Sequence, residues 1–323
     1  MLSDVSAESI LDLIIIGAGP AGLTAAQYGA RANLSVLVLE QLSPGGQALN
    51  IDVLENYPGI APGKSGFEFG EDLRLQAEGF GAKILTEDAK ALNKEGGLFI
   101  ITLASGKTLK AQAVIIATGA KHRTLDIPGE KEFSGRGVSY CATCDGPFFK
   151  SKKIFVVGGG DAACDEAQYL SRLSNQVILI HRRERFRAQK ALADRVLHNP
   201  NITVRFNTVM KEIRGTPGTK VSSVLLEENG TSREESADAV FIFTGIVPQT
   251  SLVSGAGSGL KVELDEAGYI VTDQKMASSV PGLFAAGDVR TTPFRQVITA
   301  AADGAVAAHC AAAYIDGLKG ESY

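Results

Sequence analysis

A glycine loop between an apolar segment and a segment of small residues constrains the fold of this 323-residue chain more than any other feature. Residues 12–40 read DLIIIGAGPAGLTAAQYGARANLSVLVLE, with Gly17, Gly19 and Gly22 directly after the first apolar run. A second apolar run ends at Glu40, 23 residues after the first glycine. A strand, a glycine turn, a helix, a second strand and an acid, in this order, form the full context of a dinucleotide-binding βαβ unit.

Each part of this loop has a physical role in holding a pyrophosphate. Gly17 permits the tight turn, Gly19 lets the backbone approach the pyrophosphate, and Gly22 brings the helix close to the strand. The first turn of the helix, which includes Ala21, offers free N–H groups and the positive end of the helix dipole to the anion. Glu40 is placed to accept hydrogen bonds from an adenosine ribose. The sequence therefore predicts a nucleotide site at the start of the chain.

The same design returns in the middle of the chain, which indicates a duplicated domain. Residues 153–181 read KIFVVGGGDAACDEAQYLSRLSNQVILIH, with Gly158, Gly160 and Ala163 in place of the three glycines. The following apolar run ends at His181, again 23 residues after the first glycine. We therefore expect an α/β fold with two Rossmann-like domains.

A second pair of segments supports the duplication. The segment VIIATG at 114–119 and the segment VFIFTG at 240–245 are both apolar runs that close on Thr-Gly. We expect Thr118 and Gly119 to contact the first nucleotide, and Gly245 to contact the second.

The two copies differ at the position that reads the ribose. His181 replaces the acid, and Arg182, Arg183, Arg185 and Arg187 follow closely in HRRERFRA. An acid repels a 2′-phosphate, whereas guanidinium groups pair with it in a bidentate manner. The first copy therefore suits FAD or NAD and the second suits NADP, although composition alone also allows a solvated basic helix start.

Two stretches near the C-terminus favour a flavin in the first copy. The segment GLFAAGDVR (282–290) is an apolar strand that closes on Gly287 and Asp288, and a carboxylate at this place can bond a ribityl hydroxyl. The segment 294–314 is predicted to be a helix of small residues that packs closely on the cofactor. Taken singly, the two stretches also fit an ordinary βα junction and a tightly packed helix.

The segment SYCATCDG (139–146) carries two cysteines two residues apart. A zinc site needs about four ligands, and neither a second C-x-x-C pair nor histidines at ligand spacing occur. A static disulfide is unexpected in a chain that looks cytosolic and has only four cysteines. We interpret Cys141 and Cys144 as a redox couple, and Asp145 as a candidate proton donor and acceptor beside it, unless it is only a turn residue.

Composition excludes several other classes. The net charge of −4 gives no electrostatic reason to expect nucleic acid. No uninterrupted apolar run approaches 18 residues, so no membrane span is expected. Acidic residues stand where a secretory signal carries lysines, which indicates a cytoplasmic protein.

In combination, these motifs make the chain resemble the low-molecular-weight, bacterial-type thioredoxin reductases over nearly its whole length. They occur in that family's order: GAGPAG, PGGQ, ENYPG, ATGA, CATCDG, GGGDAA, HRRERFRA, AAGDVR and FRQVITAA. The resemblance implies a homodimeric, FAD-dependent pyridine nucleotide-disulfide oxidoreductase that uses NADPH to reduce thioredoxin. It also implies two three-layer ββα domains, with an NADPH-binding domain (123–249) that carries the couple and is inserted into an FAD-binding domain (1–122 and 250–323).

The resemblance also implies roles for single residues. Cys144 would be the sulfur next to the flavin, Cys141 the one that attacks thioredoxin, and Asp145 the acid and base. Phe148 and Phe149 match a segment that helps to dock thioredoxin, although adjacent phenylalanines are more often core. The implied FAD contacts beyond the first glycine loop are Gly45, Gly46, Gln47, Asn56, Asp288, Arg295, Gln296 and Val297. The implied grip on the 2′-phosphate is formed by Arg182, Arg183 and Arg187.

Two positions depart from the family's usual pattern. Gln249 stands where asparagine is common, and Asp161 adds a negative charge near the second pyrophosphate, which is expected to weaken NADPH binding. Several other functions remain open. The acceptor can be a glutaredoxin-like protein or a peroxiredoxin system, and the chain can be a ferredoxin-linked flavoprotein, a dithiol oxidase or a non-catalytic flavin-binding module.

Overall fold

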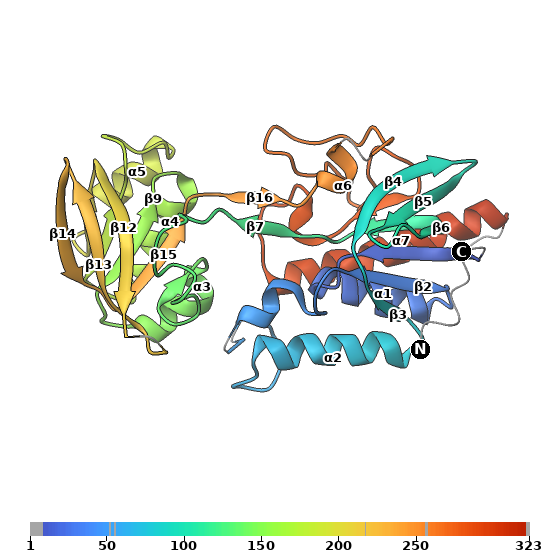
Figure 1. Ribbon diagram of the computed structural model, residues 1–323, viewed down its shortest axis with the longest axis horizontal. Coiled ribbons are helices and arrows are strands. Elements are labelled where there is room, and N and C mark those ends of the chain that lie inside the picture. The colour runs from blue at the N-terminus through green and yellow to red at the C-terminus, as the bar shows by residue number, and fades with distance from the viewer. Residues whose placement is uncertain (1–8, 52, 55, 217, 256–257, 321–323) are drawn as a thin grey trace. The chain divides into compact units, whose positions relative to one another are not determined.

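The structure is a computed structural model in which the chain packs as two compact units. The described residues of 1–121 and of 247–323 form unit 1, and those of 122–246 form unit 2 (Figure 1). Unit 1 is therefore built from both ends of the chain, and unit 2 is inserted between them. The residues that the structure describes are 9–51, 53–54, 56–216, 218–255 and 258–320.

Unit 1 is built on a seven-stranded sheet in the order β3-β2-β1-β6-β5-β4, with β17 also paired to β6. The strands β1, β2, β3, β6 and β17 run parallel, and β4 and β5 are antiparallel. The bounds of these strands are β1 (Ile10–Ile16), β2 (Val36–Glu40), β3 (Lys83–Thr86), β4 (Ala89–Glu95), β5 (Leu98–Leu103), β6 (Thr108–Ile116) and β17 (Leu283–Ala285).

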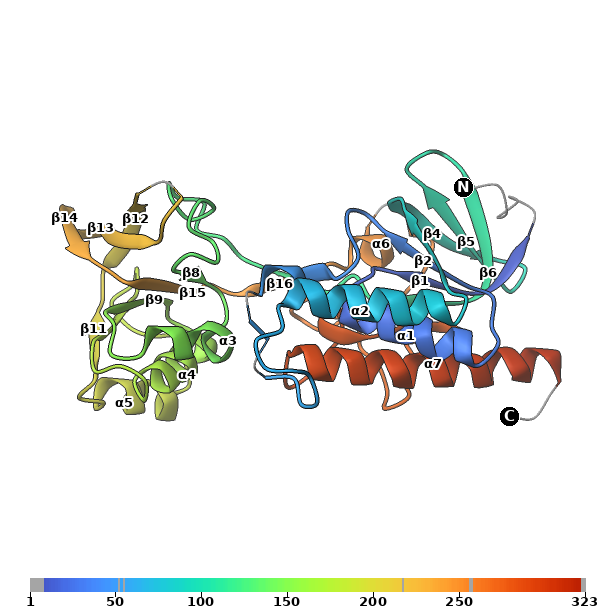
Figure 2. The same ribbon diagram turned by 90° about the horizontal axis from the view of Figure 1, so that it is seen from below.

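Three long helices cover one face of this sheet, as Figure 2 shows. They are α1 (Pro20–Arg31), α2 (Gly66–Gly79) and α7 (Val297–Lys319). Because both faces of the central strands are covered, β1 is apolar on both sides, and Leu13, Ile14 and Ile15 are fully buried. Helix α7 packs closely on α1, since Gly304 has no side chain at the contact. A Cβ atom on Gly304 would overlap the carbonyl oxygen of Ala21.

Helix α7 is long and apolar enough to cross a membrane when judged by length and composition alone. Its side chains at Ala307, Ala308, Ala311 and Ile315 are buried in the core of unit 1, beneath the sheet. Packing against α1 thus accounts for the apolar residues on the buried side of this helix, which make up less than half of its apolar window. The absence of a membrane span stays a prediction.

Unit 2 repeats the layered design in three layers, which Figure 2 shows in succession. A five-stranded parallel sheet has the order β11-β10-β9-β15-β8, and a three-stranded antiparallel sheet has the order β12-β13-β14. The predicted fold class, two three-layer Rossmann-like domains with one inserted in the other, is confirmed. The elements are β8 (Val138–Ser139), β9 (Ile154–Gly158), α4 (Asp161–Leu170), β10 (Val177–Ile180), α5 (Lys190–Leu197), β11 (Ile202–Arg205), β12 (Thr208–Gly215), β13 (Val221–Glu228), β14 (Thr231–Ser236) and β15 (Ala239–Phe243).

The chain passes between the units twice, at β7 (Ala120–His122) and β16 (Ile246–Pro248), and these two strands pair with each other. The remaining elements are the short helices η1 (Gly46–Asn50), α3 (Ala142–Asp145), η2 (Gly146–Phe149), α6 (Ser251–Ser254) and η3 (Gly287–Val289).

Candidate functional site

A cavity of about 530 Å³ opens at the carboxyl ends of the parallel strands of unit 1. This is the edge of an α/β sheet at which ligands usually bind, and the volume is that of a typical cofactor pocket. The residues predicted from the sequence that line it are Gly17, Gly19, Ala21, Glu40, Gly46, Gln47, Thr118, Gly119, Gly287, Asp288, Gln296 and Val297. Segments far apart in the sequence therefore meet at one site, as the motifs predict.

The turn between β1 and α1 has the geometry that its glycines allow. Gly17 has a φ of +105°, and a Cβ atom there would overlap the carbonyl oxygen of Ala117. A Cβ atom on Gly22 would overlap the carbonyl oxygen of Gly17. Gly19 is the N-cap of α1, and no side chain caps the helix. The N-terminus of α1 therefore faces the cavity with backbone donors that no capping side chain occupies.

Glu40 lies at the end of β2 and holds two backbone segments at the cavity. Its Oε2 atom accepts a hydrogen bond from the N–H of Ala18 at 2.8 Å, and Oε1 accepts one from Leu42 at 3.0 Å. Each carboxylate oxygen can accept a second bond. The side chain thus fixes the glycine loop and keeps acceptor capacity for a ribose hydroxyl.

The Gly45–Gly46 loop folds onto the first glycine loop. The N–H of Gly45 donates to the carbonyl oxygen of Ala18 at 2.7 Å. A Cβ atom on Gly46 would lie 2.8 Å from the Cα atom of Gly19. The two glycine motifs touch, which the sequence order alone does not reveal. The side chain of Gln47, next along the chain, donates to the carbonyl oxygen of Ala120.

Asp288 is the cavity residue whose acidity is changed most. Burial raises the pKa of its carboxyl from 3.8 to about 6, an effect that Arg295 opposes and Asp303 adds to. The guanidinium of Arg295 stacks on the ring of Tyr269, with 4.2 Å from Cζ to the ring centroid, and its buried Nε atom has no hydrogen-bond partner among the residues that the structure describes. Asp303 accepts a hydrogen bond from the N–H of Gly287 at 3.1 Å. Tyr269 and Asp303 were not predicted, because no sequence spacing connects them to Asp288.

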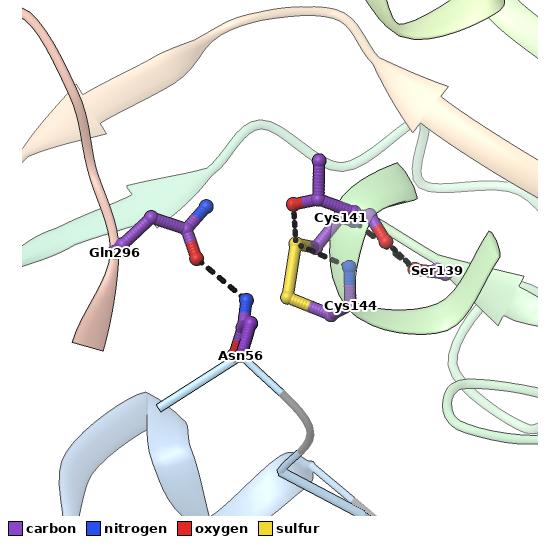
Figure 3. Close-up of a disulfide and its surroundings, with 6 residues drawn as sticks. Asn56, Ser139, Cys141, Cys144 and Gln296 are labelled. Carbon is purple, nitrogen blue, oxygen red and sulfur yellow. Dashed lines mark hydrogen bonds between the residues drawn. A yellow bond between two sulfur atoms is a disulfide. The ribbon is translucent and has the colours of Figure 1, made fainter. Parts of the chain in front are cut away.

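Two further contacts close the wall of the cavity. Asn56 donates to Gln296 with 2.9 Å between Nδ2 and Oε1 (Figure 3). Thr118 donates through Oγ1 to the carbonyl oxygen of Gln249 at 2.7 Å, and the Gln249 amide donates back to the carbonyl oxygen of Thr118 at 2.5 Å. Gln249, a departure from the family's pattern, therefore serves as a brace for the Thr-Gly segment.

The second glycine loop, between β9 and α4, has the same construction. A Cβ atom on Gly158 would lie 2.5 Å from the Cβ atom of Ala163, so this pair sets the distance between strand and helix. Gly160 is the N-cap of α4, without a side-chain cap. The carboxylate of Asp161 accepts hydrogen bonds from Gln189, from the backbone N–H at 2.7 Å and the side-chain amide at 3.1 Å. Its charge is thus partly satisfied within the protein, which lessens the weakening of nucleotide binding that we expect.

His181 and the arginines after it have different environments. His181 is only 7% exposed, and its ring fills the space next to Gly159, where a Cβ atom would overlap Nδ1. Burial lowers the pKa of His181, and the charges of Arg187, Arg183 and Arg182 lower it further. The three arginines are exposed, so their guanidinium groups are available to a ligand. The glycine at 159, packed against the imidazole, was not predicted.

Cys141 and Cys144 form a disulfide at the start of α3, with 5.4 Å between their Cα atoms (Figure 3). Cys141 is the N-cap of this helix, and its sulfur accepts a hydrogen bond from the N–H of Cys144 at 3.3 Å. The N–H of Cys141 donates to Oγ of Ser139 at 3.0 Å. A sulfur that accepts a backbone N–H at a helix start is stabilised as a thiolate once the bond is reduced.

The residues around the couple have separate roles. Asp145 ends α3, and its N–H donates to the carbonyl oxygen of Cys141 at 3.2 Å. Phe148 is 49% exposed, whereas Phe149 packs edge-on against Phe241 with 5.9 Å between ring centroids. Phe148 is therefore a surface residue, whereas Phe149 is a partly buried residue that packs against the core of unit 2.

The two remaining cysteines lie outside this site. Cys164 is buried, and burial raises the pKa of its thiol to about 11. Cys310 is partly buried on α7. Within the described ranges, no group of three or more His, Cys, Asp or Glu side chains is arranged to hold a metal ion.

Comparisons with known proteins identify the family of this chain. Residues 11–304 match the family model described as pyridine nucleotide-disulphide oxidoreductase. The thioredoxin reductase of Treponema pallidum is 57% identical over 314 residues, which cover 97% of this chain and 99% of that protein. The thioredoxin reductase of Bacillus subtilis is 43% identical, with 98% of each chain covered.

A solved structure gives the same result. The crystal structure of thioredoxin reductase from Streptococcus pyogenes superimposes with a TM-score of 0.89 at 42% identity, covering 95% of this chain and 99% of that one. The chain therefore belongs to the pyridine nucleotide-disulphide oxidoreductase family and, within it, to the thioredoxin reductases.

Proposed function

We propose that this chain catalyses the reduction of the thioredoxin disulfide by NADPH, with FAD bound in unit 1 and NADPH bound on unit 2. The observation that carries the proposal is the Cys141–Cys144 disulfide at the start of α3, in a chain with two glycine loops built for nucleotides. The couple gives the enzyme a dithiol that can reduce a second disulfide by exchange. The proposed domains are 1–122 with 250–323 for FAD, and 123–249 for NADPH.

The residues of unit 1 fit a flavin dinucleotide. The uncapped N-terminus of α1 offers backbone donors to a pyrophosphate. Glu40 retains acceptor capacity for the adenosine ribose, and Asp288 lies on the cavity wall to accept a hydrogen bond from a ribityl hydroxyl. Arg295 brings a buried Nε–H donor that the protein leaves unpaired. We assign the other predicted FAD contacts to the loops and the helix starts around this cavity.

The residues of unit 2 fit a nicotinamide dinucleotide that carries a 2′-phosphate. The N-terminus of α4 is also uncapped by a side chain. Arg182, Arg183 and Arg187 are exposed at the end of β10, where the first copy has an acid. We assign these three guanidinium groups to the 2′-phosphate, and His181 to the packing of the loop beside it.

The protein's own contribution to the chemistry lies at the couple. When bound, the two cofactors would supply the two electrons that the disulfide needs for its reduction. Two electrons and two protons convert the disulfide into thiols at Cys141 and Cys144, and we assign to Cys144 the role of the sulfur that exchanges electrons with the flavin. Asp145 exchanges the proton that distinguishes thiol from thiolate.

The thiolate of Cys141 then attacks one sulfur of the substrate disulfide and forms a mixed disulfide, releasing the other substrate sulfur. Cys144 attacks Cys141 in turn, which reforms the internal disulfide and frees the reduced substrate. Phe148, exposed beside the couple, is proposed to contact thioredoxin. We further propose a cytoplasmic homodimer that binds neither nucleic acid nor membrane.

The test is NADPH consumption by the purified enzyme under low oxygen, with and without an oxidised thioredoxin from the same source. We expect consumption that depends on thioredoxin and prefers NADPH to NADH. Bleaching of the flavin without turnover would refute thioredoxin as the acceptor and favour a glutaredoxin-like or peroxiredoxin partner. A flavin that NADPH does not bleach would refute the nucleotide assignment of unit 2 and favour a ferredoxin-linked enzyme or a dithiol oxidase.

A further inference from the structure

Unit 2 holds a buried carboxylate that none of the proposed steps uses. Glu130 is 3% exposed, and its oxygens accept four hydrogen bonds. Leu125 donates its N–H to both oxygens, at 2.9 and 3.0 Å, and Asp126 donates its N–H at 2.8 Å. The fourth donor is the hydroxyl of Tyr140, at 2.7 Å.

The arrangement is unusual because the carboxylate has no cation beside it. Among the residues that the structure describes, no lysine, arginine or histidine forms an ion pair with Glu130. A buried carboxylate costs free energy unless every lone pair is engaged. The two backbone donors fix the loop that follows β7. Within the described part of the chain, the Tyr140 hydroxyl is the one side-chain group that donates to this carboxylate.

Tyr140 connects this carboxylate to the redox couple through the backbone. It directly precedes Cys141, and its ring stacks on His122 with 5.2 Å between centroids. Burial raises the pKa of the Tyr140 hydroxyl, and the hydrogen bond to Glu130 raises it further. The hydroxyl thus stays a donor throughout the ordinary pH range. The strand that leads to Tyr140, β8, has only two residues, so it anchors this segment weakly.

The position of Cys141 depends more on the anchoring of Tyr140 in the reduced protein than in the oxidised one. In the oxidised protein, the disulfide ties Cys141 to α3. Reduction adds two electrons and two protons to the couple and breaks this covalent tie, so that Cys141 is then held by its hydrogen bonds to Ser139, Cys144 and Asp145 and by the anchoring of Tyr140. Looser placement of Cys141 lowers the effective concentration of one sulfur at the other and makes ring closure less favourable.

We propose that Glu130 and Tyr140 are positioning residues that hold Cys141 in place when the dithiol is open. This proposal rests on the proposed redox role of the couple. Its expected consequence is that loss of the hydrogen bond favours the dithiol over the disulfide. The loss of a hydrogen bond to a charged group corresponds to about tenfold in the closure constant, which is a shift of about 30 mV toward a less negative reduction potential.

The test uses the holoenzyme with Tyr140→Phe, Glu130→Gln and the double variant. The ratio of disulfide to dithiol at Cys141 and Cys144 is measured in buffers of oxidised and reduced dithiothreitol, by thiol labelling and peptide mass spectrometry. Tyr140→Phe keeps the ring that stacks on His122 and removes only the hydroxyl. Glu212→Gln serves as the control, because Glu212 lies on β12 and pairs with Arg214 at the surface.

We expect the potential to become less negative in both single variants, with no further shift in the double variant, and to be unchanged in Glu212→Gln. Bleaching of the flavin by NADPH should keep its rate, since it does not require the couple. An unchanged potential in Tyr140→Phe, or effects that add in the double variant, would overturn the proposal. If Glu130→Gln does not fold, Tyr140→Phe alone decides.

The outcome is separate from that of the proposed function. The potential is read without thioredoxin, so a wild-type enzyme that fails to reduce thioredoxin still yields the comparison between variants. Conversely, an unshifted potential in a variant that turns over thioredoxin normally refutes the positioning role and leaves the proposed function intact.

Discussion

Asp288 is the residue whose chemistry depends most on its surroundings in the unit 1 cavity. Its folded pKa of about 6 lies above its usual value of 3.8. Between these two values the folded apoprotein binds more protons than the unfolded chain, so its free energy of unfolding falls as the pH rises. The stabilising effect of the bound proton is fully present below about pH 4 and is lost through pH 6. Above about pH 6, the ionised carboxylate of Asp288 therefore lowers the free energy of unfolding of the apoprotein.

Replacing Asp288 with Asn removes the ionisation and with it the cost. We expect Asp288→Asn to stabilise the flavin-free protein at pH 8 by up to about 3 kcal/mol and to have little effect at pH 4. Thermal unfolding of the apoprotein across this pH range measures the effect. FAD affinity at pH 8 should fall by about tenfold, because a charged acceptor is lost. A change in melting temperature that is the same at every pH would contradict this explanation.

Arg182 and Arg183, which follow β10, give a second test at this scale. Arg182→Ala combined with Arg183→Ala should raise the KM for NADPH by about tenfold or more, because bidentate contacts with a phosphate are lost. The KM for NADH should change little, since NADH carries no 2′-phosphate. Arg185→Ala is the matched control, as it removes the same charge from the same exposed segment. Equal effects on NADPH and NADH would refute the assignment to the 2′-phosphate.

Some of these residues were predictable from the sequence and others were not. The glycines and the cysteine pair stand at fixed spacings, because a tight turn or a short disulfide loop is a local constraint on the chain. Tyr269, Asp303, Glu130 and Tyr140 act through contacts across space, and the sequence between the partners carries no pattern that marks them. The packing of His181 on Gly159 belongs to the same group.

At the scale of elements, the close approach of α1 and α7 shapes the cavity. The two helices meet at Gly304 and Ala21, with the first turn of α1 at the cavity wall. The small residues of segment 294–314 predicted a helix, and a helix is present. Its bounds differ from the prediction, because α7 begins at Val297 and continues to Lys319. Its end is set by Gly320, whose left-handed conformation caps the helix, whereas Gly317 three residues earlier lies inside the helix.

Substitutions at two glycines of α7 distinguish the effect of helix packing on stability from the effect of helix propensity. Gly304→Ala puts a methyl group into the Ala21 carbonyl and should lower the free energy of unfolding by about 1 to 3 kcal/mol. It should also weaken flavin binding, because the first turn of α1 has to move. Gly317→Ala adds a methyl group where no atom lies within 4 Å, so it should stabilise the helix by about 0.5 to 1 kcal/mol.

Chemical denaturation and flavin titration of the two variants provide the measurement. If both substitutions change stability in the same direction and by similar amounts, helix propensity rather than the contact between α1 and α7 decides the outcome.

At the scale of the whole molecule, one chain contains two copies of a nucleotide-binding design and one redox couple. The duplication was predictable because both copies keep the same order of strand, glycine loop, helix and strand. The couple lies in unit 2, which is inserted into unit 1. Before the structure, the insertion could be predicted only from the resemblance. No pattern in the residues themselves requires residues 9–121 and 247–320 to share one sheet.

The central claim is that the Cys141–Cys144 couple accepts electrons from NADPH by way of a flavin. Anaerobic titration of the holoenzyme with NADPH, followed by flavin absorbance and thiol labelling, tests it most directly. We expect the wild-type enzyme to take up about two equivalents of NADPH per chain, one for the flavin and one for the disulfide, and Cys144→Ser to take up about one. Equal uptake by the wild type and Cys144→Ser, with the wild-type disulfide still intact, would contradict it.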